Sequence, residues 1–408
     1  MATAVHADHV SRHAPRAERS VTHERWRWRM SAEARALVLV TSVLIAVGLA
    51  VLYSASAIVA MQPPYDNSAF FLLRQLSGVM LGIVVFAIAA KVDAERWSRW
   101  AWPLMGLSLL LMLIVILPFT EAIAPRINGS RRFIFGSSLQ PSELAKLAVV
   151  IWTAMLVVKK GPAVRRLTKG VLPFLLVIGT LDLLAVLEPD LSAAMMYTLL
   201  MALILFAGGA RIGHFVLLGV VAVPVLWSEM QRLQYTLLRM VTFLDPGRMP
   251  AELSYQLNQS LLGVGTGQLT GVGFGQGRQQ YGFLPLSYND FIGATIGEEF
   301  GFIGMVGIVF LYALYAWLGF RIARRARSPF LTLAAVGLTI TTALTAFLHI
   351  GVVIGLLPTT GLTLPFISYG RSNLVLSLLM TGILVNIGSV RERVVGERAT
   401  DPMSFGGR

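Results

Sequence analysis

Long apolar runs recur along this chain and constrain its fold more than any other feature of the sequence. About 20 consecutive apolar residues are enough for one helix to cross the roughly 30 Å hydrocarbon core of a membrane. The sequence is 55% hydrophobic and only 13% charged, whereas soluble domains carry about 25% charged residues. Because a helix satisfies its own backbone hydrogen bonds inside lipid, the pattern predicts an all-α polytopic membrane protein.

About ten transmembrane helices are predicted from these runs. They lie at 34–60, 70–90, 99–117, 142–158, 170–187, 191–207, 212–227, 291–320, 330–356 and 364–389. Lysine and arginine concentrate in the short connections on the side of both termini, which the positive-inside rule assigns to the cytoplasm. We therefore expect a multi-pass membrane protein with both termini cytoplasmic.

The same reading divides the chain into three parts. Residues 1–32 are expected to be a disordered cytoplasmic tail, 33–390 a transmembrane domain, and 391–408 a second cytoplasmic tail. A long extracytoplasmic loop at 228–290 joins the seventh and eighth predicted helices. Loops of this length are usually functional or disordered, and we expect this one to be functional.

Composition excludes several kinds of site. The chain has no cysteine, so it has no disulfide, thiolate metal site or cysteine nucleophile. Four of its six histidines lie in the N-terminal tail, and only His214 and His349 remain for the membrane body, which argues against a multi-histidine metal cluster. The net charge of +13 is a topology signal rather than a sign of nucleic-acid binding. No window of the glycine-rich stretch 263–282 matches a nucleotide-binding motif.

Ionisable groups near membrane depth are functional candidates, because each costs about 2.5–3.5 kcal/mol to insert. Glu143 and Lys146 at the start of the fourth predicted helix share one helix face. They form either a self-neutralising pair, or Lys146 points into a cavity and pairs with an acid from elsewhere, for which Asp290 is the candidate. Asp290 itself could cap the next helix, take part in chemistry, or do both.

Small residues and outer arginines add two further expectations. Gly78-x-x-x-Gly82 and Gly297-x-x-x-Gly301 predict close helix packing. Arg131 and Arg132 lie on the predicted outer side, against the positive-inside rule. They indicate an anionic ligand, nearby acids or lipid headgroups.

Eight motifs occur in an order that resembles one known family. They are Asn-Gly-Ser-Arg-Arg at 128–132, Gln-Pro-Ser-Glu-Leu-Ala-Lys at 140–146, Pro-Asp-Leu at 189–191, Tyr-Gln-x-x-Gln-Ser at 255–260, Phe-Leu-Pro-x-x-x-x-Asp-Phe-Ile at 283–292, Gly-Glu-Glu-x-Gly at 297–301, Gly-Leu-Leu-Pro-Thr-Thr-Gly at 355–361 and Leu-Pro-x-Ile-Ser-Tyr-Gly at 364–370. The family is SEDS (shape, elongation, division and sporulation), and the likeness spans about residues 35–390. The chain looks more like FtsW than RodA.

The resemblance implies an inner-membrane peptidoglycan glycosyltransferase with ten spans that polymerises lipid II outside the cytoplasm, on the periplasmic side, in division or elongation. It implies a class B penicillin-binding protein as the crosslinking partner, together with other membrane proteins of division or elongation. Asp290 aligns with the family's essential acid and Lys146 with its fourth-span lysine. We predict Asp290 as the base for the 4-hydroxyl of the acceptor GlcNAc, with undecaprenyl pyrophosphate leaving and Lys146 keeping the base ionised.

We predict that the remaining site residues bind substrate. They are Arg131, Arg132, Glu143, Arg74, Gln256, Gln259, Ser368 and Arg371. The arginines are expected at the pyrophosphate. No residue set reads as a metal site, and a divalent cation, Mg²⁺ or Mn²⁺, stays open as a helper at the pyrophosphate.

Several positions depart from the family pattern. Leu286, Tyr288 and Asn289 replace the usual Glu, His and Thr, and Ser192 replaces the usual Gly after Pro-Asp-Leu. Arg371 and Asn373 replace a Gly and a Ser after Ser-Tyr-Gly. These changes keep the acid but alter its neighbours. Two other functions stay open: a lipid II flippase, against which the lack of an internal repeat argues, and a non-catalytic division scaffold, which would tolerate the loss of Asp290.

Overall fold

A computed structural model describes residues 24–121, 124–125, 131–134, 139–220, 223 and 251–395. The chain divides into two compact units, one of residues 30–389 and one of the two ends. In the ends, β1 (Glu24–Met30) pairs with β2 (Ser389–Val395). The sequence had predicted disordered tails here. The other tail residues lie outside the described part of the chain.

The unit of residues 30–389 is helical, as predicted. Its long helices are α1 (Ala32–Ala60), α2 (Phe70–Lys91), α3 (Arg96–Ile116), α4 (Pro141–Lys160), α5 (Leu172–Leu187), α6 (Leu191–Ala207), α10 (Ile292–Arg324), α11 (Pro329–Val353) and α12 (Arg371–Ile387). Among the described residues, 7 segments are long and apolar enough to cross a membrane, and α6 and α12 are shorter apolar helices. Residues 212–220 of the predicted seventh span are helical, while most of 221–227 lies outside the description. The count of ten spans stays a prediction.

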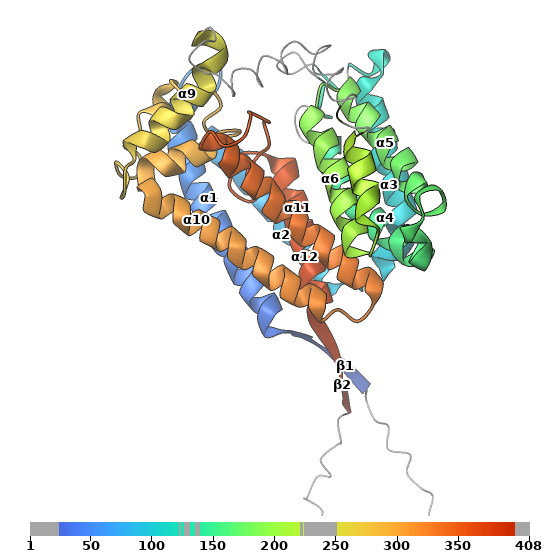
Figure 1. The fold of residues 1–408 in the computed structure, drawn as a ribbon. Helices are drawn as coiled ribbons and strands as arrows, with labels where there is room; N and C mark the ends of the chain where they lie inside the picture. Colours follow the sequence, from blue (N-terminus) through green and yellow to red (C-terminus); the bar gives the residue numbers. More distant parts are fainter. Residues whose placement is uncertain are drawn as a thin grey trace, which may run out of the picture. The chain divides into compact units, whose positions relative to one another are not determined.

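Helices α4, α11 and α12 are the most buried helices of the bundle. In Figure 1, α3, α4, α5 and α6 lie together, α1 runs beside α10, and α2 lies beside α12. Helix α11 contacts both α4 and α6 as well as α10. In the most apolar stretch of the α4 segment and of α11, 61% of residues are buried, whereas 28% are buried in the corresponding stretches of α2 and α3. Glu143 and Lys146 near the start of α4 accordingly lie inside protein.

Glycines bring α2 and α12 into close contact. A Cβ atom at Gly78 would lie 3.2 Å from Arg371 Cγ, and one at Gly82 would lie 2.4 Å from Leu378 Cδ1. Larger residues would push the two helices apart. The close packing predicted from Gly78-x-x-x-Gly82 is confirmed.

The predicted long loop contains a helix that the sequence analysis did not find. Helix α9 (Ala251–Thr266) and a 3-10 turn, η4 (Gln279–Tyr281), lie within 228–290. Helix α9 packs against α10 and α11 (Figure 1). Its buried residues Ser254, Leu257 and Ser260 recur at helical spacing, but two of them are polar. The apolar pattern was therefore too weak to reveal the helix.

Helix α10 is broken where the glycine-rich part of the loop meets it. Gly301 has φ 65° and ψ −160° inside the helix. The amides of Phe302 and Ile303 donate instead to Gln268 O and Leu269 O, at 2.9 and 3.1 Å. The loop thus replaces the helical hydrogen bonds lost at the break.

Gly297 makes the second close approach. A Cβ atom there would lie 2.9 Å from Val264 Cγ2 of α9. The packing predicted from Gly297-x-x-x-Gly301 therefore takes place against the loop and α9, and not against another membrane span.

Candidate active site

Residues 354–370, between α11 and α12, connect the parts of the candidate site; we call them the 354–370 segment. Ser192 Oγ at the start of α6 donates to Thr360 O at 2.5 Å. The ring Nδ1 of His349 lies 2.7 Å from Leu362 O. Ser192 is one of the departures from the family pattern. Its hydroxyl makes a contact that glycine could not make.

The N-terminal ends of four helices meet around this segment. Gln140 N, just before α4, donates to Ser372 Oγ in the first turn of α12 at 3.0 Å. Ser368 Oγ donates to Asn289 O, three residues before α10, at 2.8 Å. With the Ser192 contact at α6, the ends of α4, α6, α10 and α12 are joined. Helix N-termini carry partial positive charge, so their meeting favours an anionic ligand.

Asp290 is half-buried against the 354–370 segment. A Cβ atom on Gly361 would lie 3.7 Å from Asp290 Oδ2, so a glycine leaves room beside the carboxylate. Helix α10 begins at Ile292 with Phe291 at its N-cap position. Asp290 is therefore not the N-cap, which was one of the two roles left open. The Gly293 amide donates to His349 Nε2 at 3.4 Å.

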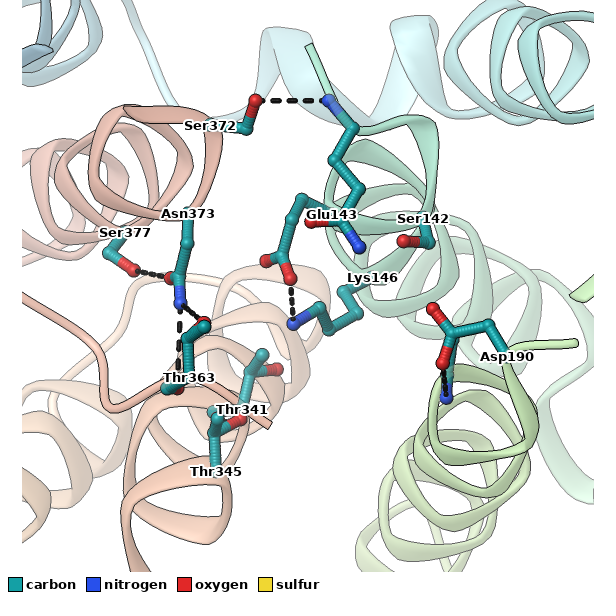
Figure 2. A network of polar contacts seen from close by, with 12 residues as sticks. Ser142, Glu143, Lys146, Asp190, Thr341, Thr345, Thr363, Ser372, Asn373 and Ser377 are labelled. Carbon is teal, nitrogen blue, oxygen red and sulfur yellow. Dashed lines mark hydrogen bonds and ion pairs between the residues drawn. The ribbon is translucent and has the colours of Figure 1, made fainter. Parts of the chain in front are cut away.

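Lys146 pairs with Glu143 inside the bundle. Lys146 Nζ lies 2.7 Å from Glu143 Oε1, and the two side chains are only 7% and 10% exposed. Figure 2 shows the pair on α4 facing Asn373 of α12 and the hydroxyls of Thr341 and Thr345 of α11. The structure thus has the self-neutralising pair, the first of the two interpretations. The influence of Lys146 on Asp290 stays a prediction.

The two outer arginines bind groups of the protein itself. Arg131 donates from Nη1 to Leu117 O at 3.0 Å and also pairs with Glu121. Arg132 donates from Nε to Glu188 O at 3.4 Å and contacts the carbonyl of the next residue. They cross-link the loop after α3 to the turn between α5 and α6. Of the three explanations, a nearby acid accounts for Arg131, which pairs with Glu121, whereas Arg132 binds backbone carbonyls. A role of either arginine at the substrate stays a prediction. Asn128–Ser130 lie outside the described residues.

The turn that Arg132 contacts holds a buried acid. Glu188 is 3% exposed. Burial raises the pKa of its carboxyl to about 9; the nearby Asp190 charge adds to the rise, and Arg132 opposes it. Asp190 caps α6 by accepting from Ala193 N at 3.2 Å. Burial thus favours the neutral form of the acid in this turn.

The two predicted glutamines lie on α9. Gln259 Oε1 accepts from Gln279 Nε2 at 3.1 Å, and Gln256 is half-buried on the same helix. Ser260 Oγ donates to Val353 O at the end of α11. These contacts fasten α9 to the rest of the loop and to α11. Whether the glutamines bind substrate stays a prediction.

Ser368 and Gln75 hold the 354–370 segment in place, and the sequence analysis did not identify Gln75 as a site residue. Ser368 is 4% exposed, and its Oγ also accepts from Leu364 N at 2.8 Å. Gln75 of α2 donates from Nε2 to Ser368 O and accepts from Gly370 N, both at 3.1 Å. The sequence does contain a signal for this role, because Gln75 is a polar amide directly after Arg74 in an otherwise apolar helix. Arg74 and Arg371 are half-buried beside this contact.

A metal site does not emerge from the part of the chain that the structure describes. In that part, no group of three or more His, Asp or Glu side chains is arranged to hold an ion. Mg²⁺ commonly uses one or two carboxylates together with substrate phosphates. A cation shared with the substrate therefore stays a proposal.

Comparison with known proteins gives the family. The family model for FtsW, RodA and SpoVE, described as "Cell cycle protein", matches residues 34–393. The chain belongs to the FtsW/RodA/SpoVE family. The resemblance to SEDS proteins is confirmed, and the protein is a multi-pass membrane protein.

Named relatives agree with this assignment over nearly their full length. The chain is 36% identical over 353 residues to a probable peptidoglycan glycosyltransferase FtsW of Trichlorobacter lovleyi, covering 86% of this chain and 92% of the relative. It is 36% identical over 351 residues to the stage V sporulation protein E of Bacillus subtilis, covering 86% and 95%.

Two solved structures resemble the fold. One chain, from a structure described as "Structural coordination of polymerization and crosslinking by a peptidoglycan synthase complex", has a TM-score of 0.70 and 28% identity, covering 87% of this chain and 97% of that one. The rod shape determining protein RodA of Thermus thermophilus has a TM-score of 0.62 and 27% identity, covering 86% and 95%. The fold described above is thus the fold of this family.

Proposed function

We propose that this protein is a peptidoglycan glycosyltransferase that polymerises lipid II, with Asp290 as the general base. Its curated relatives support the activity, since several carry this name and align over most of the chain. The observation that carries the assignment of Asp290 is its position. The half-buried carboxylate lies against the 354–370 segment, where four helix N-termini meet.

The reaction needs one base and a set of positive groups. The 4-hydroxyl oxygen of the acceptor GlcNAc forms a bond to the anomeric carbon of a lipid-linked MurNAc, and the bond from that carbon to pyrophosphate breaks. Asp290 takes the hydroxyl proton, and undecaprenyl pyrophosphate leaves with the bonding electrons. A positioned base contributes about 10²–10⁴-fold. Because the leaving group is already a stable anion, the second carboxylate used by glycoside hydrolases is not required.

Positive charge at the site suits this leaving group. The N-terminal ends of α4, α6, α10 and α12 each present a partial positive charge. Arg74 and Arg371 add guanidinium groups, which match phosphate oxygens in a bidentate manner. Lys146 stays in the proposal as the second charged group of the site, with Glu143 as its direct partner.

In the cell, the Asp290 end of the bundle would face the periplasm. The opposite end carries Arg321 and Arg325, which pair with Glu33, and the positive-inside rule places it in the cytoplasm. In the proposed orientation both termini are cytoplasmic, and the proposed location is the inner membrane, as expected for a peptidoglycan glycosyltransferase. A class B penicillin-binding protein is the proposed partner, supported by the structural neighbour from a peptidoglycan synthase complex.

The test is polymerisation of fluorescent lipid II by the purified complex with its transpeptidase partner. Asp290→Asn should slow polymer formation by about 10²–10⁴-fold. Asp66→Asn is the matched control, because Asp66 is exposed and lies in the loop between α1 and α2 at the same end. A rate for Asp290→Asn close to wild type would refute the base assignment. Lipid II transfer across liposomes without any polymer would favour the flippase instead.

A further inference from the structure

Aromatic rings from three segments gather at the Asp290 end of α2. Phe71 lies at their centre, with its ring centroid 4.6 Å from Tyr288, 5.1 Å from Tyr65 and 5.2 Å from Tyr369. The backbone joins two of these residues as well, since Tyr369 N donates to Tyr288 O at 3.0 Å. We call these four rings the aromatic shelf.

The shelf has a buried base and reachable rings. Phe71 is 4% exposed and Tyr65 is 40% exposed, while Tyr288 and Tyr369 are half-buried. A ring that belonged only to the core would be covered on all sides. The shelf therefore has a buried base and leaves part of its aromatic surface uncovered.

Two arginines border the shelf. Arg74 Cζ lies 5.9 Å from the ring centroid of Phe70. The stem of Arg371 rests against α2 at Gly78, one helical turn beyond Arg74. Burial raises the pKa of the Tyr369 hydroxyl, and the charges of Arg74 and Arg371 oppose that rise. Arg371 follows Tyr369 by two residues, and Arg74 precedes Gln75, which bonds Ser368 O and Gly370 N on the two sides of Tyr369.

The shelf adjoins the proposed base. Tyr288 precedes Asp290 by two residues. Burial, together with Tyr65, Tyr369 and the charge of Asp290, raises the pKa of the Tyr288 hydroxyl to about 12. Tyr288 and Asp290 thus belong to the same short stretch of the loop, which Ser368 and Tyr369 fasten to the 354–370 segment.

Two departures from the family pattern meet here. Tyr288 stands where a His is usual and Arg371 where a Gly is usual. They are 83 residues apart in the sequence, and the fold brings the Tyr288 ring to 5.9 Å from the ring of Tyr369, two residues before Arg371. One departure adds a larger aromatic face and the other adds a guanidinium group.

We propose that Tyr288 and Arg371 act together as a specificity-determining pair for the sugar–diphosphate end of the lipid-linked donor. Tyr288 packs against the sugar ring, and Arg371 binds the diphosphate. Aromatic rings offer large apolar faces, and an arginine fork matches phosphate oxygens. The donor is the ligand that fits, because its diphosphate is attached to the reacting carbon, whereas the acceptor's diphosphate is a disaccharide away from its reacting hydroxyl. This inference rests on the proposed function.

Binding of two probes to the purified complex tests the pair without turnover. One probe is a fluorescent lipid II analogue that lacks the 4-hydroxyl of GlcNAc, and the other is undecaprenyl pyrophosphate, which has no sugar. Arg371→Gly should weaken both probes by about 10- to 100-fold, as for hydrogen bonds to a charged group. Tyr288→Leu should weaken only the sugar-bearing probe, by about 3- to 10-fold, and Tyr288→Phe should bind like wild type.

Matched controls come from the same loop. Tyr281→Leu and Arg278→Gly change exposed side chains and should leave both affinities unchanged, and melting curves confirm that each variant is folded. If neither Arg371→Gly nor Tyr288→Leu alters binding, the proposal is overturned. Equal weakening of both probes by Tyr288→Leu would overturn the sugar contact. Failure of the folded wild-type complex to bind the lipid II analogue would instead count against the proposed function.

Discussion

Removing Glu143 from its buried pair with Lys146 should destabilise the protein more than removing Lys146. We consider Glu143→Gln, Lys146→Met and the double variant. The charged atoms are 2.7 Å apart, which gives an attraction of about 6 kcal/mol at an effective dielectric of 20. Much of this offsets desolvation, so removing one partner of a buried pair typically costs about 3–5 kcal/mol, while replacing both is often close to neutral.

The helix end makes the two single variants differ. Glu143 lies in the first turn of α4, where the positive end of the helix stabilises a carboxylate by up to about 2 kcal/mol. After Lys146→Met, the remaining carboxylate still has this partner. After Glu143→Gln, the remaining ammonium lies near a positive helix end. Glu143→Gln should therefore be the more destabilising change by about 1–2 kcal/mol, and the double variant should be more stable than either.

Unfolding in mixed detergent micelles measures these differences as apparent free energies. Glu121→Gln is included as a control, because it removes a paired acid whose side chain is 61% exposed rather than buried. A Lys146→Met variant that is as destabilised as Glu143→Gln would refute the helix-end argument. Single variants that cost less than about 1 kcal/mol, as exposed pairs do, would show that the pair is hydrated.

Three further predictions follow from individual contacts. Gly48→Ala should destabilise the protein by about 1–3 kcal/mol in detergent melting experiments, because its Cβ would lie 2.6 Å from Phe366 O; Gly106→Ala, with nothing within 4 Å, should be neutral or stabilising. Because the folded pKa of Glu188 is raised to about 9, its contribution to stability is complete below about pH 4 and is lost as the pH rises toward 9. Melting temperatures of Glu188→Gln should therefore fall less than those of wild type between pH 5 and 8, and parallel curves would contradict this. Arg132→Lys should cost about 1 kcal/mol in the same melting assay, because one ammonium cannot reach both carbonyls that the guanidinium contacts; an unchanged melting temperature would contradict it.

Features that depend on local pattern were predictable from the sequence. Apolar runs located most spans, because membrane thickness fixes their length. Spacing alone placed Glu143 and Lys146 on one face of α4. Small residues at four-residue spacing predicted that α2 packs closely against another helix, which in the structure is α12. Each of these depends on residues close together in the chain.

Features that depend on distant partners were not predictable. The partners of Arg131 and Arg132 are ends of α3 and α5, which no local pattern connects to them. Helix α12 was expected from 364, but residues 364–370 form part of the segment that lines the site, so their apolar side chains pack inward without forming a helix. Helix α9 escaped because its buried face is partly polar.

Single-turnover kinetics of the purified complex test the role of Asp290 most directly. Wild-type protein and Asp290→Asn are compared at saturating lipid II across a range of pH. A base predicts a bond-forming rate at least about 100-fold lower for the variant, with unchanged lipid II affinity and with no loss of rate on acidification of the kind seen in wild type. A variant that keeps the wild-type rate and the wild-type pH profile would contradict the account.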